Sequence, residues 1–269
     1  MPTPPVPARP TALITGASSG IGEALARCFA RNGYRLVLVA RNEAKLRVLA
    51  DSLRTAHGTR TDVLAADLAR PGAASALASA LRRKRRPIDV LVNNAGVLEH
   101  GAFCAIDGAR HQQLIDLNVS GLTAMLAAFV PEMVARGRGR VLNVASIAAF
   151  QPLPGLATYA AAKAYVLSLS ESLAEELRES GVTVTALCPG ITATGMLSSA
   201  TERDARLSGL PAFLVGDVDE VANDGYRACL AGEVIAVPGA INQAAAMAAG
   251  ATPKWLLRRF VGVLGRKLI

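Results

Sequence analysis

Tyr159 and Lys163 are four residues apart in a Tyr-Ala-Ala-Ala-Lys motif, and Ser146 precedes the tyrosine by thirteen residues. On a helix, positions four apart lie on one face, so the ammonium of Lys163 can sit beside the phenol of Tyr159. A neighbouring cation favours the phenolate, so we expect Lys163 to lower the pKa of Tyr159 toward working pH. The pair predicts a tyrosine that acts as a general acid or base. Tyr and Lys at this spacing also occur on plain surface helices.

The segments around these residues alternate between apolar strands and helices. Continuous apolar runs such as 36–40 are typical of a parallel sheet that is covered on both faces. The alternation predicts right-handed βαβ units, and hence an α/β fold with a doubly wound parallel sheet of about seven strands, the Rossmann fold. Strands are expected at 12–15, 36–40, 62–66, 90–92, 139–144, 183–187 and 234–237, and helices near 24–33, 43–55, 71–85, 107–136 and 159–180.

The chain of 269 residues is long enough for one large α/β domain, and no linker or long repeat divides it. We expect this domain at 11–250, after a proline-rich tail at 1–10. A helical and loop insertion follows the sixth strand, and residues 251–269 form a basic amphipathic C-terminal segment.

The formal net charge is +8, which permits affinity for acidic ligands or surfaces. The basic run at 82–86 closes a predicted helix, where cations complement the helix dipole, and no recognition motif accompanies it. We therefore expect no nucleic-acid partner. The four cysteines lack C-x-x-C spacing, so we expect buried thiols in a reducing compartment and no metal site. No signal-peptide pattern or convincing membrane span is visible, and the expected location is cytoplasmic.

A glycine-rich turn with Gly16, Gly20 and Gly22 lies between the first predicted strand and the helix that follows. Glycines permit a tight turn and close backbone approach, while the start of the helix faces a pyrophosphate. The strand before the turn and the helix after it favour dinucleotide binding over a plain tight turn.

Arg41 stands at the end of the second predicted strand, where an acidic residue usually holds the ribose 2′-hydroxyl of NAD(H). Arginine suits a 2′-phosphate, so the sequence favours NADP(H) over NAD(H). Ser18 could add a hydrogen bond to the same phosphate. Two observations leave the alternative open: Glu43 lies nearby, and Arg41 could be an exposed loop cation.

Taken together, these residues resemble the short-chain dehydrogenase/reductase family over about residues 10–240. Ala145 and Ala162 depart from the family pattern, which often has serine at both positions. The matching residues occur in family order and are Thr15 to Gly22, Asn93-Asn94-Ala95-Gly96, Asn118, Ser146, Tyr159, Lys163 and Pro189-Gly190.

The resemblance implies which residues contact the cofactor. The glycine turn would wrap the adenosine and pyrophosphate, Asp67 and Leu68 would flank the adenine, and the segment after the sixth strand would close over the nicotinamide. Asn93 is expected to brace the sheet instead. The implied cofactor residues are Gly16, Ser18, Ser19, Gly20, Ile21, Gly22, Arg41, Asp67, Leu68, Asn94, Ala95, Gly96, Tyr159, Lys163, Pro189, Gly190, Thr192 and Thr194.

The resemblance also implies the chemistry, which is reduction of a ketone or aldehyde or oxidation of the matching secondary alcohol. Ser146 would polarise the substrate carbonyl, and Tyr159 would transfer the proton. Lys163 would lower the pKa of the tyrosine and hold the nicotinamide ribose. Asn118 would position a water that links Lys163 to solvent. The cofactor performs the hydride transfer.

The resemblance places a substrate lid at about 191–215. An apolar small-molecule substrate is expected, although the same side chains could pack the lid on the domain instead. His100 and His111 are interpreted as surface or loop histidines. The apolar residues are Ile191, Met196, Leu197, Leu207, Leu210, Pro211, Phe213 and Leu214 in the lid, and Phe150, Leu153 and Leu156 before Tyr159.

The resemblance implies a homodimer or homotetramer formed through the helices at about 107–136 and 158–180. For the segment 253–269, packing on protein is favoured over contact with an anionic membrane. Two other functions stay open: a non-catalytic NADP(H)-binding sensor or scaffold, and a peripheral membrane enzyme that acts on lipid-like carbonyls. A sensor would be expected to lack a member of the Ser, Tyr and Lys set, and all three are present.

Overall fold

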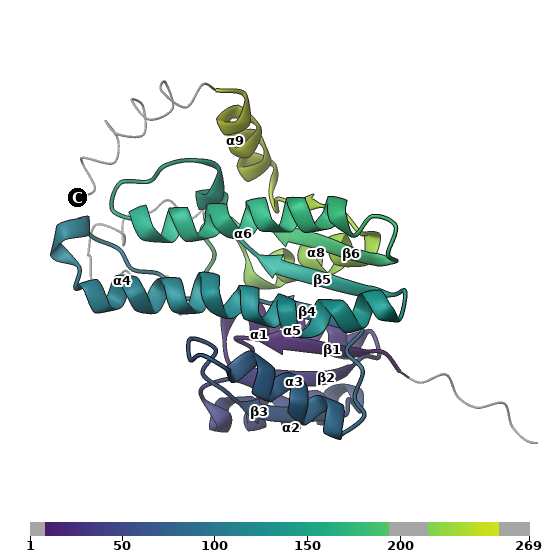
Figure 1. Cartoon of the computed structure of the whole chain (residues 1–269). Coiled ribbons are helices and arrows are strands. Elements are labelled where there is room, and N and C mark those ends of the chain that lie inside the picture. Colours follow the sequence, from purple (N-terminus) through teal and green to yellow (C-terminus); the bar gives the residue numbers. More distant parts are fainter. Residues whose placement is uncertain (1–8, 194–214, 253–269) are drawn as a thin grey trace, which may run out of the picture.

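The computed structural model describes residues 9–193 and 215–252, and its strands form one parallel seven-stranded sheet (Figure 1). The strand order is β3-β2-β1-β4-β5-β6-β7, so the direction of winding reverses between β1 and β4. This arrangement confirms the predicted doubly wound Rossmann fold. The strands are β1 (Thr11–Thr15), β2 (Arg35–Ala40), β3 (Thr61–Ala65), β4 (Val90–Asn93), β5 (Gly139–Val144), β6 (Val182–Leu187) and β7 (Ile235–Ala236).

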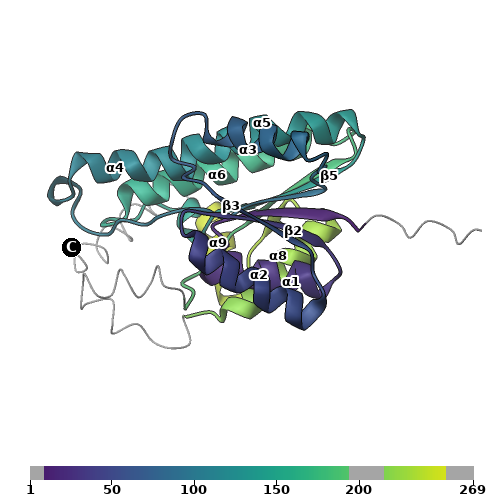
Figure 2. The same cartoon turned by 90° about the horizontal axis from the view of Figure 1, so that it is seen from below.

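Helices cover both faces of the sheet, as the view from below shows (Figure 2). One layer consists of α1 (Gly20–Arg31), α2 (Glu43–His57) and α8 (Val218–Ala231). The opposite layer consists of α3 (Ala73–Arg83), α4 (Gly108–Ile115), α5 (Leu122–Ala135) and α6 (Ala157–Glu176), while α9 (Ala240–Ala251) follows β7.

Side chains alternate along each strand between two apolar cores. In β2, Leu36 and Leu38 are buried in the core with α1, α2 and α8, whereas Val37 and Val39 face the core with α3, α5 and α6. Both sets are buried because the sheet has helices on each face, which explains why the strand reads as a continuous apolar run.

Local signals explain where several elements begin and end. Asn42 caps α2 by accepting a hydrogen bond from the backbone N–H of Lys45 at 3.0 Å. The same helix runs two residues beyond the predicted end and stops at Gly58, whose φ of 62° is left-handed. Strand β7 covers only Ile235 and Ala236 of the predicted 234–237. Pro238 follows, and its lack of an N–H prevents it from donating to the ladder.

The expected helix at 107–136 is a composite. A π-helical turn at Asp116–Gly121 joins α4 to α5 without a break in the coil. By length and hydropathy the segment Gly108–Ala135 resembles a membrane span. However, Met125, Phe129 and Met133 are buried in the core, as in the core helix of a globular domain.

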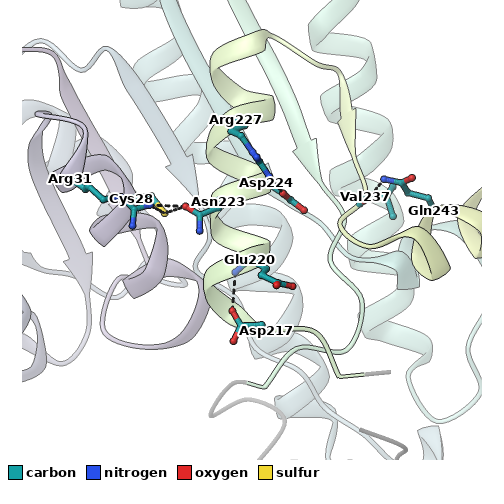
Figure 3. A network of polar contacts seen from close by, with 9 residues as sticks. All are labelled: Cys28, Arg31, Asp217, Glu220, Asn223, Asp224, Arg227, Val237 and Gln243. Carbon is teal, nitrogen blue, oxygen red and sulfur yellow. Dashed lines mark hydrogen bonds and ion pairs between the residues drawn. The ribbon is translucent and has the colours of Figure 1, made fainter. Parts of the chain in front are cut away.

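Polar contacts attach α8 to α1 on the other face of the sheet (Figure 3). The side-chain oxygen of Asn223 accepts hydrogen bonds from Arg31 Nη2 at 2.7 Å and from the buried thiol of Cys28 at 3.3 Å. Asp217 caps α8 by accepting from the backbone N–H of Glu220 at 2.9 Å. The chain that follows the sixth strand is thus anchored to the first helix.

Candidate active site

The predicted site residues gather at the carboxyl ends of the central strands, beside the point where the strand order reverses. In open parallel sheets this position forms a crevice where ligands bind. The turn after β1, the segment after β4, Ser146 after β5 and Pro189 after β6 all lie at this edge.

The glycine turn after β1 has no room for side chains at two of its glycines. A Cβ added to Gly16 would lie 2.7 Å from Nδ2 of Asn94, and one added to Gly22 would overlap the carbonyl oxygen of Gly16. Gly16 also has a φ of 65°, which favours glycine. Ser19 precedes α1 without using its side chain as a cap. The turn therefore presents backbone and the start of a helix to a ligand.

Thr15 fastens this turn to the end of β4. Its hydroxyl donates to the carbonyl oxygen of Val92 at 3.2 Å and accepts from the backbone N–H groups of Asn94 at 2.9 Å and Ala95 at 3.0 Å. The amide of Asn94 in turn donates to the backbone oxygen of Thr15 at 2.9 Å. From the sequence, Thr15 was named only as the first residue of the matching motif, without a role of its own. The signal available there was a hydroxyl at the last position of a buried strand.

Arg41 follows β2, is exposed, and forms no ion pair or hydrogen bond with other residues in the described ranges. The competing acid, Glu43, instead pairs with Arg47 in the first turn of α2. Beyond β3, Asp67 accepts from the backbone N–H of Ala69 at 3.2 Å, and Leu68 is buried. Within the part of the chain that the structure describes, no carboxylate engages the guanidinium of Arg41.

The predicted catalytic side chains converge between β5, β6 and α6. Ser146 lies beside Tyr159 and favours the ionised form of its phenol, and the serine hydroxyl donates to the carbonyl oxygen of Pro189 at 3.5 Å. Lys163 donates to the carbonyl oxygen of Val144 at 2.8 Å, and its Nζ lies 5.7 Å from the centre of the Tyr159 ring. A serine hydroxyl, a phenol and an ammonium therefore share one buried site.

Asn118 reaches the same site from the π-helical turn. Its side-chain amide forms two 2.9 Å hydrogen bonds with the backbone of Val97, donating to the oxygen and accepting from the N–H. A Cβ added to Gly96 would lie 3.2 Å from Oδ1 of Asn118 and 3.6 Å from Nζ of Lys163. Gly96 thus lies beside both the amide and the ammonium, and a larger residue there would crowd them.

Burial controls the acidity of the two titratable groups. It raises the pKa of Tyr159 above its ordinary value, although the hydrogen bond with Ser146 opposes the effect. It lowers the pKa of Lys163 to about 8, opposed by the nearby Cys188 thiol. The expectation that the pKa of Tyr159 falls toward working pH is therefore wrong for this arrangement. The ammonium is bonded to Val144, and removal of the phenol from water has the larger effect.

The segment after β6 contacts the site at Ser146, through the carbonyl oxygen of Pro189. The hydroxyl of Thr192 donates to the carbonyl oxygen of Gly190 at 3.1 Å, and Thr192 pairs with Gly216 in an isolated bridge. A Cβ on Gly190 would lie 2.6 Å from the side chain of Asn242 in α9, a contact with no sequence signal. Outside the described residues lie the predicted Thr194, the lid residues Met196, Leu197, Leu207, Leu210, Pro211, Phe213 and Leu214, and the segment 253–269.

Apolar side chains surround Tyr159. Leu153 and Leu156 pack there as part of the same cluster, together with Val97 and Leu98, which the sequence analysis did not select. Phe150 lies elsewhere: it packs on the core that includes α5 and α6, and it lines a cavity of about 570 Å³ beside β7 and α9.

A buried chain of hydrogen bonds braces the strands below the site. Asn93 donates to the side-chain oxygen of Asn143 at 2.9 Å, and Asn143 donates to the hydroxyl of Ser170 at 2.9 Å. The chain connects β4, β5 and α6. Sequence reasoning gave Asn93 this kind of role but missed its two partners.

Comparison with known proteins yields consistent matches. The sequence pattern described as "short chain dehydrogenase" matches residues 10–205. Oxidoreductase UcpA of Escherichia coli (strain K12) is 40% identical over 190 residues, which are 70% of this chain and 72% of that protein.

Two solved structures extend the similarity to most of the chain. A short-chain dehydrogenase from Sphingobium yanoikuyae in complex with NADPH is 37% identical, with a TM-score of 0.79, and the match covers 91% of this chain and 96% of that one. A bulky-bulky ketone specific alcohol dehydrogenase from Comamonas testosteroni is 34% identical, with a TM-score of 0.75 and coverage of 91% and 95%.

Proposed function

Because the chain belongs to the short-chain dehydrogenase family, we propose that it is an NADP(H)-dependent enzyme that reduces an apolar ketone or aldehyde, or oxidises the matching secondary alcohol. The observation that carries this proposal is the convergence of Ser146, Tyr159 and Lys163 beside the glycine turn. The same convergence argues against a non-catalytic sensor, which needs no such set.

The residues around the glycine turn fit a dinucleotide. The space that a Cβ would fill at Gly16 and Gly22 lets a pyrophosphate approach the backbone at the start of α1. Arg41 would pair with the 2′-phosphate, since its guanidinium is exposed and Glu43 is engaged by Arg47. Asp67 and Leu68, the segment Asn94–Gly96 and the segment Pro189–Thr192 would hold the remaining parts. The bound nicotinamide supplies or accepts the hydride.

Ser146 and Tyr159 would act on the same substrate oxygen, because the serine hydroxyl lies close enough to the phenol to oppose the rise of its pKa. The serine donates a hydrogen bond that polarises the carbonyl. Tyr159 holds its proton near neutral pH and can donate it to the substrate oxygen in the reductive direction. The ammonium of Lys163 stabilises the phenolate that remains after proton transfer.

Asn118 would support proton return to this site. Its amide uses one donor and one acceptor on Val97, which leaves one hydrogen and one lone pair for a water. Oδ1 of Asn118 and Nζ of Lys163 both approach the place of a Cβ added to Gly96, at 3.2 Å and 3.6 Å, so a water held by the amide would be near the lysine. It could pass a proton between the lysine and solvent.

The walls of the site support an apolar substrate. Val97, Leu98, Leu153 and Leu156 pack around Tyr159. A carbonyl compound with alkyl or aryl groups would bury its apolar surface against them, whereas a sugar would leave hydroxyl groups without partners. One similar solved protein is described as specific for bulky-bulky ketones, which agrees with this class.

We also propose that the enzyme forms a homodimer or homotetramer through the face of α4, α5 and α6 that points away from the sheet. Ile115, Val134 and Tyr165 are each more than a third exposed on these helices, with values of 37%, 38% and 39%. Such side chains would be covered by a second copy. Light scattering of the wild type and a Val134→Glu variant tests this, because an unchanged mass for the variant argues against the interface.

The experiment that tests the activity follows NADPH oxidation with propiophenone, a long-chain methyl ketone and benzaldehyde, with dihydroxyacetone as the polar control. We expect the apolar carbonyls to react faster. The Tyr159→Phe variant should bind NADPH like the wild type but lose turnover at least about a hundredfold, since it cannot transfer the proton. Equal turnover by this variant would refute the assigned role of the phenol. A preference for dihydroxyacetone would refute the apolar substrate.

A further inference from the structure

His111 on helix α4 contacts two other elements, the first turn of α6 and the short 3-10 helix after β4. It lies half-buried on α4, and its Nδ1 is 2.8 Å from the hydroxyl of Thr158 in the first turn of α6. Its Nε2 is 3.2 Å from the carbonyl oxygen of Phe103, in the short 3-10 helix Phe103–Ala105 after β4. The imidazole also stacks on the ring of Phe103, with centroids 4.4 Å apart. This is more than the surface or loop histidine that the sequence suggested.

The partners fix the roles of the two ring nitrogens. A carbonyl oxygen only accepts, so Nε2 of His111 carries a hydrogen and donates to Phe103. In the neutral ring Nδ1 then accepts from the hydroxyl of Thr158. Each nitrogen therefore serves one neighbouring element, and the two contacts can be removed separately.

The first turn of α6 depends on such contacts from outside the helix. Leu156 stands at its N-cap and provides no side-chain cap. Thr158 is the residue directly before Tyr159. One helical turn beyond His111, Leu114 is fully buried in the same apolar cluster as Tyr159. Helix α4 thus holds this turn of α6 by one polar contact and one apolar contact.

We propose that His111 is a positioning residue, which holds Tyr159 through Thr158 and, through Phe103, holds the loop after β4 that carries Val97 and Leu98. This role of His111 rests on the proposed function only because the reaction whose rate is measured is the proposed carbonyl reduction. The contact with Thr158 sets the position of the phenol and therefore affects kcat. The contact with Phe103 sets the loop after β4, whose Val97 and Leu98 line the proposed substrate site, and therefore affects KM.

Two variants separate the contacts. His111→Asn places an oxygen where Nδ1 was and keeps the bond from Thr158, whereas His111→Gln places an amide nitrogen where Nε2 was and keeps the bond to Phe103. Thr158→Val removes the hydroxyl alone, and Thr158→Ser restores it. Full-length variants are compared for propiophenone reduction, NADPH affinity and hydrogen–deuterium exchange of the backbone.

We expect His111→Gln and Thr158→Val each to lower kcat about fivefold, to leave KM within about twofold, and to speed exchange at 157–161. Their combination should cost no more than either change alone. His111→Asn should raise KM about fivefold and speed exchange at 101–106 instead. NADPH affinity should stay within about twofold throughout.

The proposal would be overturned if both His111 variants had the kcat, KM and hydrogen exchange of the wild type. It would also be overturned if His111→Asn and His111→Gln changed these quantities in the same way. Additive losses from His111→Gln and Thr158→Val would overturn it as well, because the two changes remove one and the same contact. If the wild type does not reduce propiophenone, the proposed activity on this substrate fails. The segment-specific exchange then still decides the role of His111.

Discussion

Lys163 is buried at a cost to stability, and its replacement by methionine should reveal that cost. Its side chain is 6% exposed, and burial lowers its pKa from an ordinary 10.5 to about 8. Below pH 8 the ammonium is charged in both the folded and the unfolded protein, and the difference between the two pKa values amounts to about 3 kcal/mol against folding. The uncharged thioether of the Lys163→Met variant would carry no such penalty.

The sign of the pH dependence follows from proton binding. Between pH 8 and 10.5 the unfolded chain holds the Lys163 proton more often than the folded protein does, so wild-type stability rises with pH in this window. From pH 7 to pH 9 this group should add about 1 kcal/mol to the free energy of unfolding, and Lys163→Met should lack that gain. The Lys163→Met variant also removes the hydrogen bond to the carbonyl oxygen of Val144. This loss offsets about 1–3 kcal/mol of the stability gained at neutral pH by removing the buried charge.

The assay is urea unfolding of both proteins at pH 7 and pH 9, at one protomer concentration so that assembly contributes equally. The stability of the wild type minus that of Lys163→Met should increase by about 1 kcal/mol between the two pH values. Lys45→Met, at an exposed position on α2, is the matched control and should show no such change. A difference that stays constant or decreases from pH 7 to pH 9 would refute the burial argument.

Three further substitutions test the cofactor side of the site, each by titration with NADPH. Arg41→Asp should weaken NADPH binding about ten- to a hundredfold and leave NADH binding unchanged. The control Arg54→Asp should change the binding of neither cofactor. Equal losses of NADPH and NADH binding in Arg41→Asp would contradict the 2′-phosphate contact. Thr15→Val should lower the free energy of unfolding in urea by about 1–3 kcal/mol and weaken NADPH binding, because two backbone N–H groups lose their acceptor. Thr15→Ser keeps the hydroxyl and should retain both the stability and the NADPH binding of the wild type. Gly22→Ala should weaken NADPH binding at least about tenfold, because the added Cβ overlaps the glycine turn. The control Gly250→Ala has open space around the added Cβ and should bind NADPH normally. Normal binding by both variants would show that the glycine turn accommodates the Cβ without loss of the cofactor site.

The fold could be predicted from local patterns because burial on both faces imposes apolar runs on the strands. The run 36–40 became β2, and the strand–glycine–helix order at Gly16–Gly22 became the turn after β1. Boundaries were less accurate where tertiary contacts decide them. The short β7 ends before Pro238, and the π-helical turn at 116–121 leaves no periodic trace in a segment that reads as one apolar helix.

The motif spacing predicted that Ser146, Tyr159 and Lys163 share one site, and the folded chain places them together. It did not foresee that burial outweighs the ammonium in setting the pKa of Tyr159. That balance depends on how completely the phenol leaves water, and this is a property of the whole packed cluster. Thr15 and His111 were missed for a similar reason, since their partners are distant in sequence.

The π-helical turn between α4 and α5 has a consequence for which faces of the long helix can be buried at once. Leu114 and Leu122 are both buried, yet they are eight residues apart, which in a regular α-helix would put them about 80° out of phase. A π turn absorbs one extra residue, which brings the pair to within about 20° of alignment. The π turn thus rotates the buried face of α5 into line with that of α4, and Asn118 lies within this turn. Deletion of the exposed Ser120 would remove the extra residue, so regular winding would keep Leu114 and Leu122 within about 20° of alignment without the π turn.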